Sequence, residues 1–492
     1  MRLRLQKIEL VDEPAIDAMS REELAALAKQ WRQKLGEYQS ILFRVKKRIF
    51  GRRSEKTKSE NSKGAEPKPR GETKKRPSER YPDAKVREER LCFSKPQNCA
   101  VCGTTMQASG LVETSEYLDV DVKDFTVVEQ KREKCRCPKC HGAIVTAPSP
   151  PRVTPGGSYS DALIVDATVS KYCDLIPMER YCQMAGRGGL HGLPPHSLIQ
   201  ASFRLARFLQ PTFERIKLEA LNTSVLLADE TPHRMLEGDA KERWFLWGFS
   251  SLSACFFECH DTRSGDVSTA ILRQSRCLFL LSDAYSGYKK SITLANIERA
   301  KEGQPLIAAA YCNAHARREF LPDGENEAES LDAKFVREQY EQIYKINKEA
   351  KGLTDAEVLA KRAGMTPYFE AIRAEAIKKI DAYSSKSAMG RAYNYFLKHY
   401  DGLTVFLTNA EVAIDNNASE RLLRSPVVGR KTWYGTHSPL GAETAAVHFT
   451  IVETCKLNGV NPRAFYMDAV DRIHDKREPL TPSEFKANCN TC

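Results

Sequence analysis

The chain has 492 residues, which is too long for a single hydrophobic core and predicts about three or four folding units. It is 41% hydrophobic and 28% charged, with a mean hydropathy of -0.48, an ordinary composition for a soluble protein. The net charge of +11 favours an anionic partner, either nucleic acid or an acidic membrane surface.

The apolar pattern argues against a membrane location. The first residues, MRLRLQKIELVDEPAID, lack the continuous apolar run of a signal peptide. The most apolar later stretches, such as CLFLLSDAY at 277–285, are far shorter than the roughly 20 residues that a spanning helix needs. We therefore expect a cytoplasmic protein whose 15 cysteines bind metal or remain buried thiols rather than form disulfides.

The first predicted element, within residues 1–50, is a helix with a coiled-coil seam. Apolar residues recur there at alternating steps of three and four over more than three heptads. They are Leu24, Leu27, Trp31, Leu35, Tyr38, Leu42, Val45 and Ile49. An amphipathic helix packed on its own domain is the alternative. Because no apolar pattern precedes the helix, we favour self-association into a homodimer or higher oligomer.

A basic linker follows at residues 51–90. Residues 46–90 contain 17 Lys and Arg against 8 Asp and Glu, and residues 51–80 show no apolar periodicity. This composition is typical of a disordered segment that contacts DNA phosphates without reading the base sequence. Arg52 and Arg53 are its candidate phosphate contacts.

Two Cys-x-x-Cys motifs, CAVC and CPKC, lie within residues 91–155, separated by a stretch rich in β-branched residues. Their cysteines are Cys99, Cys102, Cys137 and Cys140. Four thiolates in this pattern predict a structural zinc ion in a DNA-binding zinc ribbon. Four unrelated buried cysteines are the alternative. Cys135 could replace Cys137, although its spacing from Cys140 breaks the motif.

Residues 156–220 are predicted to be helical. A short helix, a turn with glycine and proline, and a longer helix that carries Arg204 and Arg207 would suit a DNA-binding helix-turn-helix. A plain helical bundle explains the same pattern equally well.

From residue 221 the pattern predicts a mixed α/β core, so the fold class expected for the whole chain is multidomain α+β. Residues 221–324 contain an apolar strand, a hairpin, a helix, a second apolar strand, and a strand that runs into a helix. Residues 325–404 are helical and charged, which predicts an insertion. Residues 405–455 return to the core, and residues 456–492 predict a C-terminal helical segment and tail.

An acid follows each of two apolar strands of this core. Asp229 follows VLLA and Asp283 follows FLLS, and carboxylates at strand ends point into the crevice where open α/β sheets bind ligands. Two carboxylates held that close together require a cation, and an oxygen-rich site with few protein ligands suits a pair of Mg²⁺ ions. Glu420, on a helix beside the sheet edge, would complete the site.

Each acid also has a purely structural interpretation. Asp229 could be a turn or cap residue, with Glu230 as the ligand instead, and Asp283 could begin the turn DAYSGY. Asp415 could be a helix N-cap, with Glu420 complementing the helix dipole. Their joint occurrence on one strand pattern favours a functional site.

The ordered motifs ADETPHRML, SDAYSGY, CNAHARREF and AIDNNASERLLRSPVVGRKTWYGTHS resemble the insertion sequence 66 family of bacterial transposases, of the DDE class. The resemblance extends over nearly the whole chain, including the N-terminal coil and the paired cysteine motifs. It implies a ribonuclease-H-like core with a helical insertion, and a catalytic triad of Asp229, Asp283 and Glu420.

The resemblance implies a DNA transposase that binds the ends of an insertion sequence in the bacterial cytoplasm, associated with the nucleoid. Two Mg²⁺ or Mn²⁺ ions at the three acids would promote hydrolysis of a phosphodiester at the element end and transfer of the 3′-hydroxyl to target DNA. Basic residues that would hold the flanking phosphates are Arg421, Arg424, Arg430 and Lys431. Accessory proteins encoded by the same element are possible partners.

Cys312 and His315, in CNAH, match a Cys-x-x-His signature of several DDE families. We interpret them as structural support beside the site rather than as zinc ligands, because only two ligands are visible locally. Two other functions fit the sequence: a zinc-containing DNA-binding protein without catalysis, and a metal-dependent nuclease of the same fold without strand transfer.

Overall fold

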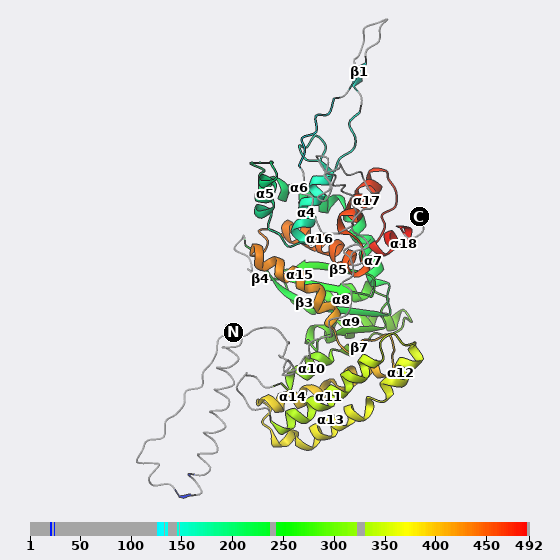
Figure 1. Cartoon of the computed structure of the whole chain (residues 1–492). Helices are drawn as coiled ribbons and strands as arrows, with labels where there is room; N and C mark the ends of the chain where they lie inside the picture. Colours follow the sequence, from blue (N-terminus) through cyan, green and yellow to red (C-terminus); the bar gives the residue numbers. More distant parts are fainter. Residues whose placement is uncertain are drawn as a thin grey trace, which may run out of the picture. The chain divides into compact units, whose positions relative to one another are not determined.

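The computed structural model describes residues 20–21, 24, 125–131, 133–135, 145–146, 148–236, 243–321 and 330–489. The chain divides into two compact units, residues 52–127 and residues 1–51 with 128–492, and every element described below belongs to the second (Figure 1). Several predictions concern residues outside the described ranges. They are the coiled coil apart from Leu24, the basic linker with Arg52 and Arg53, and the side chains of Cys99, Cys102, Cys137 and Cys140.

A mixed five-stranded sheet forms the centre of the larger unit, in the order β5-β4-β3-β6-β7. Its strands are β3 (Val225–Arg234), β4 (Arg243–Ser250), β5 (Cys255–His260), β6 (Phe279–Ser282) and β7 (Ala308–Tyr311). β3 pairs antiparallel with β4 and parallel with β6, so it joins the hairpin half of the sheet to the parallel half. A separate antiparallel ribbon consists of β1 (Lys134–Cys135) and β2 (Val145–Thr146).

Successive residues of β3 belong to two different cores, because side chains alternate between the faces of a strand. Leu226 and Ala228 pack into one hydrophobic cluster, whereas Val225 and Leu227 pack into another. Such a strand is buried on both faces, which explains why VLLA is a continuous apolar run rather than an alternating one.

Helices that precede and follow the strands in the sequence cover the face of the sheet that carries Leu226 and Ala228, here called the first face. They are α4 (Asp161–Tyr172), α6 (Pro195–Phe208), α7 (Gln210–Leu221), α15 (Asn417–Trp433), α16 (Pro439–Asn458), α17 (Pro462–His474) and α18 (Pro482–Cys489), and α5 (Met178–Arg187) packs on α4 and α6. α16 is central, because its side chains are buried almost all round. Thr450 and Thr454 of this helix hydrogen-bond the backbone of β5 and thereby cover an edge strand.

The helical insertion covers the second face. Its helices are α11 (Leu331–Glu349), α12 (Asp355–Ala363), α13 (Thr366–Lys379) and α14 (Ala388–Thr404), with short helices η1 (Ile380–Ala382) and η2 (Val405–Leu407). Phe369 and Phe396 of the insertion share one core with Leu227 of β3 and Leu281 of β6. The insertion therefore supplies the apolar layer that this face of the sheet requires (Figure 1, yellow).

Three further helices complete the core. α8 (Gly265–Gln274) precedes β6, α9 (Ser286–Lys301) connects β6 to the parallel strand β7, and α10 (Asn313–Glu319) follows β7. This β-α-β connection is the usual way to join parallel strands. It brings the ends of β6 and β7 to the same edge of the sheet.

Candidate active site

The structure places the three predicted acids close enough for their charges to interact. Asp229 lies in β3, Asp283 directly follows the neighbouring strand β6, and Glu420 lies in the first turn of α15, which packs against β3. The negative charges of Asp283 and Glu420 both act on Asp229 and raise its pKa. The three carboxylates therefore form one electrostatic cluster although they are distant in the sequence.

The position of Asp229 within its strand differs from the expectation that β3 ends there. β3 continues to Arg234, because its antiparallel pairing with β4 extends past Asp229, which faces Gly248. The parallel pairing of β3 with β6 stops earlier, at Leu227 and Leu281. Asp229 thus lies just beyond the end of the parallel ladder, where a carboxylate has room between two strands.

The neighbouring acid, Glu230, is committed to other contacts. Successive strand residues point to opposite faces, and both Glu230 oxygens are occupied. Arg263 Nε donates to Oε1 at 2.7 Å and the Tyr288 hydroxyl donates to Oε2 at 2.5 Å, with the Glu230 side chain only 1% exposed. These contacts favour Asp229 over Glu230 as the residue available to bind a cation.

No Lys or Arg among the described residues is paired with the three acids. Burial and the charges of Glu230, Asp283 and Glu420 together raise the pKa of Asp229 to about 8. Among the described residues, no Lys or Arg forms an ion pair with Asp229, Asp283 or Glu420. Oε1 of Glu420 is buried without a hydrogen-bond donor in that part of the chain. These oxygens fit Mg²⁺ or Mn²⁺, because a divalent cation would remove the repulsion and satisfy the unpaired oxygen.

A chain of three hydrogen bonds connects the segments that carry the acids. The N–H of Cys312 donates to the carbonyl of Ser282, next to Asp283, at 3.0 Å. Cys312 Sγ accepts from the N–H of Asn416 at 3.1 Å, and Asn416 Nδ2 donates to the carbonyl of Ala228, next to Asp229, at 2.9 Å. Asn416 is also the N-cap residue of α15, the helix of Glu420. We call this pair, Cys312 and Asn416, the clasp.

The clasp includes a residue whose role the sequence did not reveal. Asn416 was visible only as part of AIDNNASER, and its side chain is 1% exposed. The signal that could have identified it is an amide at the start of a helix, between two buried apolar segments. Cys312 is the other member of the clasp, and burial raises the pKa of its thiol to about 11. His315 Nε2 lies 3.5 Å from Glu420 Oε1.

Asp283 has the turn role that its sequence position also suggested, whereas Asp415 is not the N-cap of α15, because Asn416 occupies that position. Asp283 Oδ1 accepts from the N–H of Tyr285 at 3.1 Å and so begins the turn before α9. Asp415 Oδ1 accepts from the N–H of Asn417 at 3.2 Å at the start of α15. Turn formation does not remove Asp283 from the cluster, because its charge still raises the pKa of Asp229.

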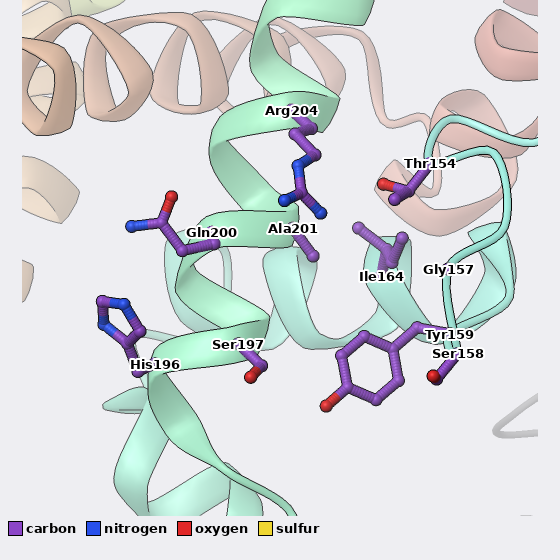
Figure 2. Close-up of a pocket in the computed structure, with 10 residues that line it drawn as sticks. All are labelled: Thr154, Gly157, Ser158, Tyr159, Ile164, His196, Ser197, Gln200, Ala201 and Arg204. Carbon is purple, nitrogen blue, oxygen red and sulfur yellow. The ribbon is translucent and has the colours of Figure 1, made fainter.

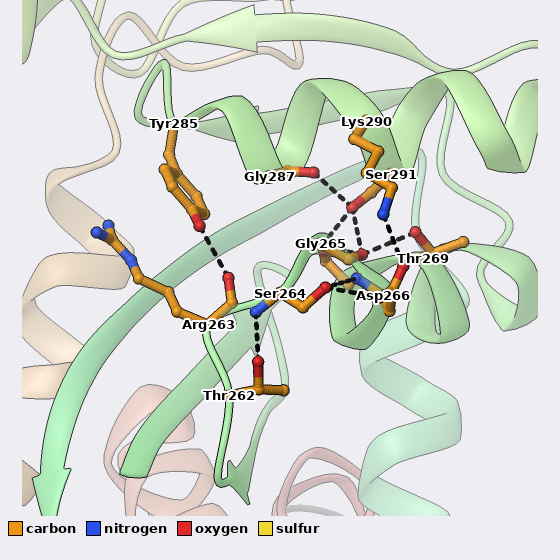
Figure 3. A network of polar contacts seen from close by, with 11 residues as sticks. Thr262, Arg263, Ser264, Gly265, Asp266, Thr269, Tyr285, Gly287, Lys290 and Ser291 are labelled. Atoms are coloured by element: carbon orange, nitrogen blue, oxygen red, sulfur yellow. Dashed lines mark hydrogen bonds and ion pairs between the residues drawn. The ribbon is translucent and has the colours of Figure 1, made fainter. Parts of the chain in front are cut away.

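The turn after Asp283 is held by a polar network between α8 and α9 (Figure 3). The Tyr285 hydroxyl donates to the Arg263 carbonyl at 2.8 Å, and Ser291 Oγ hydrogen-bonds the carbonyls of Gly265 and Gly287 at 2.7 and 2.8 Å. A Cβ on Gly265 would lie 2.5 Å from the Gly287 carbonyl oxygen, so these two helices meet backbone to backbone.

Exposed cations continue along the helix of Glu420. Arg421, Arg424 and Lys431 are exposed and have no ion pair or hydrogen bond with other described residues. Arg430 differs, because it is half-buried and has a partner. Three of the four predicted basic residues of α15 are therefore exposed and can contact an anion, with Arg421 and Arg424 nearest to Glu420 along the helix.

A second polar surface lies beside α6. Residues of this helix and of the segment before α4 line a cavity of about 320 Å³ (Figure 2). Arg204 and His196 are exposed there, and no acid lines the cavity. α5 and α6 form the short and long helices that the helix-turn-helix interpretation expected, with the turn made by Gly189 and Gly192 at positive φ.

Comparisons with known proteins identify the class of protein and then the family. A sheet edge with clustered acids beside a basic helix is suited to metal-dependent chemistry on a polyanion. The family model described as Transposase IS66 family matches residues 156–444, more than half of the chain. The chain belongs to the IS66 family of transposases.

Curated relatives extend the similarity beyond the matched residues. Uncharacterized protein y4hP of Sinorhizobium fredii (strain NBRC 101917 / NGR234) is 28% identical over 432 residues, covering 83% of this chain and 76% of that protein. Uncharacterized protein y4jD of the same organism is 27% identical over 411 residues, covering 79% and 78%. In the part of the chain that the structure describes, no helix has the length and apolar character needed to cross a bilayer.

Proposed function

We propose that this chain is a catalytically active DDE transposase with a ribonuclease-H-like core. It would cleave phosphodiesters at the ends of an insertion sequence and transfer the released 3′-hydroxyl to target DNA. The observation that supports the proposal is that the charges of Asp283 and Glu420 both act on the buried Asp229, while no Lys or Arg among the described residues forms an ion pair with any of the three acids.

The residues of the site have separate roles in this proposal. Asp229, Asp283 and Glu420 would hold one or two Mg²⁺ or Mn²⁺ ions, which supply activation of the attacking oxygen and stabilisation of the leaving oxygen. Arg421 and Arg424 would bind phosphates that flank the scissile bond and so orient the strand. Because they share α15 with Glu420, a phosphate bound to them lies beside the acids.

The remaining predicted regions would bind and assemble the DNA complex. The coil would join subunits into a homodimer or higher oligomer, and the linker and zinc ribbon would add sequence-independent and structural DNA contacts. Structural Zn²⁺ would be held by Cys99, Cys102, Cys137 and Cys140. Arg204 of α6 would contact DNA in the manner of a helix-turn-helix. DNA cleavage and strand transfer would occur at the bacterial nucleoid, with or without accessory proteins.

The test is incubation of the purified full-length chain with Mg²⁺, labelled element-end DNA and a target plasmid. Joined products are expected. Nicks alone would indicate a nuclease without strand transfer, and a bandshift without cleavage would indicate a DNA-binding protein.

Asp283→Asn should abolish cleavage and retain the bandshift. Asp266→Asn is the matched control, because Asp266 is an exposed aspartate that pairs with Lys290 and has no hydrogen bond to the three acids. Undiminished cleavage by Asp283→Asn would refute the assignment of the site.

A further inference from the structure

We propose that Cys312, His315 and Glu420 form a binding site for a soft divalent metal ion of the Zn²⁺ class, and that the bound ion withdraws Glu420 from the other two acids. The second half of this proposal rests on the proposed function of Glu420. Each residue offers one ligand atom, and these three atoms lie within 4.8 Å of one another. Among the described residues this is the only group of three or more Cys, His, Asp and Glu side chains whose ligand atoms come this close together.

Local structure brings the two α10 ligands to one side. Cys312 is the N-cap residue of α10 and His315 follows three positions later, a spacing that places both side chains on the same face of a helix. The sulfur accepts the N–H of Asn416, and the N–H groups of Ala314 and His315 also donate to it. Backbone donors around a sulfur stabilise the negative charge that a metal-bound thiolate carries.

The distances are close to those that zinc requires. With Zn–S near 2.3 Å and Zn–N and Zn–O near 2.0–2.1 Å, a tetrahedral ion holds its ligand atoms about 3.4–3.6 Å apart. His315 Nε2 and Glu420 Oε1 are already 3.5 Å apart. The remaining pairs, which lie within 4.8 Å, need to close by about 1.2 Å at most, a change within the reach of side-chain rotation.

Two further observations indicate that the site can accept an ion. Glu420 Oε1 and His315 Nδ1 are both buried atoms without a hydrogen-bond partner among the described residues. The side chains of His315 and Glu420 are nevertheless 30% and 32% exposed, which leaves a route from solvent and room for water as a fourth ligand. A site of this kind binds and releases an ion instead of enclosing it permanently.

The donor set distinguishes this site from the cluster of carboxylates. Thiolate and imidazole select Zn²⁺ over Mg²⁺, whereas carboxylates alone suit Mg²⁺ or Mn²⁺. Glu420 is common to both sets, so one carboxylate serves either the soft ion or the catalytic ions. Zinc bound at Cys312 and His315 would therefore inhibit DNA cleavage by competition for Glu420.

The first experiment counts metal ions with Co²⁺ as the spectroscopic probe. Metal-free full-length wild type and Cys312→Ser are titrated with Co²⁺, and thiolate-to-cobalt absorption is recorded. The variant should bind one equivalent of Co²⁺ fewer than wild type. Any Co²⁺ bound by the predicted zinc ribbon is common to both proteins and does not change this difference. Cys182→Ser, which changes a buried cysteine on α5, is the matched control and should bind the same number as wild type. Equal numbers in wild type and Cys312→Ser would overturn the proposal.

A second variant and readout cover the case in which Cys312→Ser folds poorly. His315→Ala changes a partly exposed side chain and should also lose one Co²⁺ equivalent. In wild type, Zn²⁺ should displace bound Mn²⁺, observed by electron paramagnetic resonance, and His315→Ala should weaken this displacement at least 10-fold.

If Zn²⁺ displaces Mn²⁺ equally well from wild type and from His315→Ala, the proposal that the two ions compete for Glu420 is overturned. Metal binding with no DNA cleavage would refute the proposed function alone. DNA cleavage by a protein without the extra Co²⁺ equivalent would refute the soft-metal site alone.

Discussion

Two polar clusters of the same core differ in how their buried groups are satisfied. Between α8 and α9, Ser291 hydrogen-bonds two carbonyls, Thr269 donates to the Gly265 carbonyl at 2.7 Å, and Lys290 pairs with Asp266 at 3.1 Å. At the acids, Asp229 accepts one backbone N–H, and Asn416 Oδ1 and Glu420 Oε1 have no donor within the described ranges.

The difference separates a structural cluster from a binding cluster. Nearly all buried polar atoms in proteins are hydrogen-bonded, so a group of unpaired ones requires an explanation. The α8–α9 network satisfies its own members and needs no ligand. Repulsion among the acids lowers the stability of the metal-free protein, and a bound cation would remove this repulsion. Active sites often show this compromise between stability and function.

The largest expected effect comes from neutralising an acid of the cluster. Asp229→Asn should reduce DNA cleavage by about 10³-fold or more, because a cation at the site contributes several kcal/mol to the transition state. The same change should raise the thermal unfolding midpoint of the metal-free protein at pH 8, because it removes a buried charge from among like charges. Cleavage of labelled DNA and thermal unfolding measure the two effects. A variant that cleaves normally, or that unfolds at a lower temperature, would contradict the comparison.

Removing the Asn416 side chain of the clasp should have a smaller effect on DNA cleavage. Asn416→Ala removes the donor to the Ala228 carbonyl and should lower cleavage about 10–100-fold, the range typical of residues that orient metal ligands. The concentration of Mg²⁺ at half-maximal rate should rise in parallel. Asn417→Ala is the matched control, because Asn417 is half-buried and its side chain has no partner among the described residues. Equal losses in the two variants would exclude a positioning role for Asn416.

The sequence was sufficient to predict the core strands and the helical insertion, but the contacts that join them required the structure. Apolar runs and helical periodicity are local, so the strands VLLA and FLLS and the insertion could be located from residue patterns. The continuation of β3 to Arg234 could not, because it depends on pairing with β4 across a turn. The roles of Asn416 and Cys312 depend on partners 188 and 104 residues away, and no local pattern encodes such a contact.

A third effect concerns the pH dependence of stability. The pKa of Asp229 rises from 3.8 to about 8 on folding, so its proton stabilises the native state below pH 4, and this contribution is lost as the pH rises through 8. The unfolding midpoint of the metal-free wild type should therefore fall by several degrees relative to Asp229→Asn between pH 5 and pH 8. Mg²⁺ at millimolar concentration should remove the difference. If the unfolding midpoints of the two metal-free proteins change in parallel with pH, burial and neighbouring charges do not raise the pKa of Asp229.

The smallest effect is expected in the satisfied network. Ser291→Ala removes the hydrogen bonds to the carbonyls of Gly265 and Gly287, and should lower the free energy of unfolding by about 1–2 kcal/mol. Ser286→Ala changes an exposed serine at the start of the same helix and should have almost no effect. Ser291 contacts none of the three acids. The decrease in the free energy of unfolding of Ser291→Ala should therefore be the same with and without Mg²⁺, and DNA cleavage per folded molecule should be unchanged. A loss that depends on Mg²⁺ would mean that the two clusters are energetically coupled, since only the acids are expected to respond to a divalent cation.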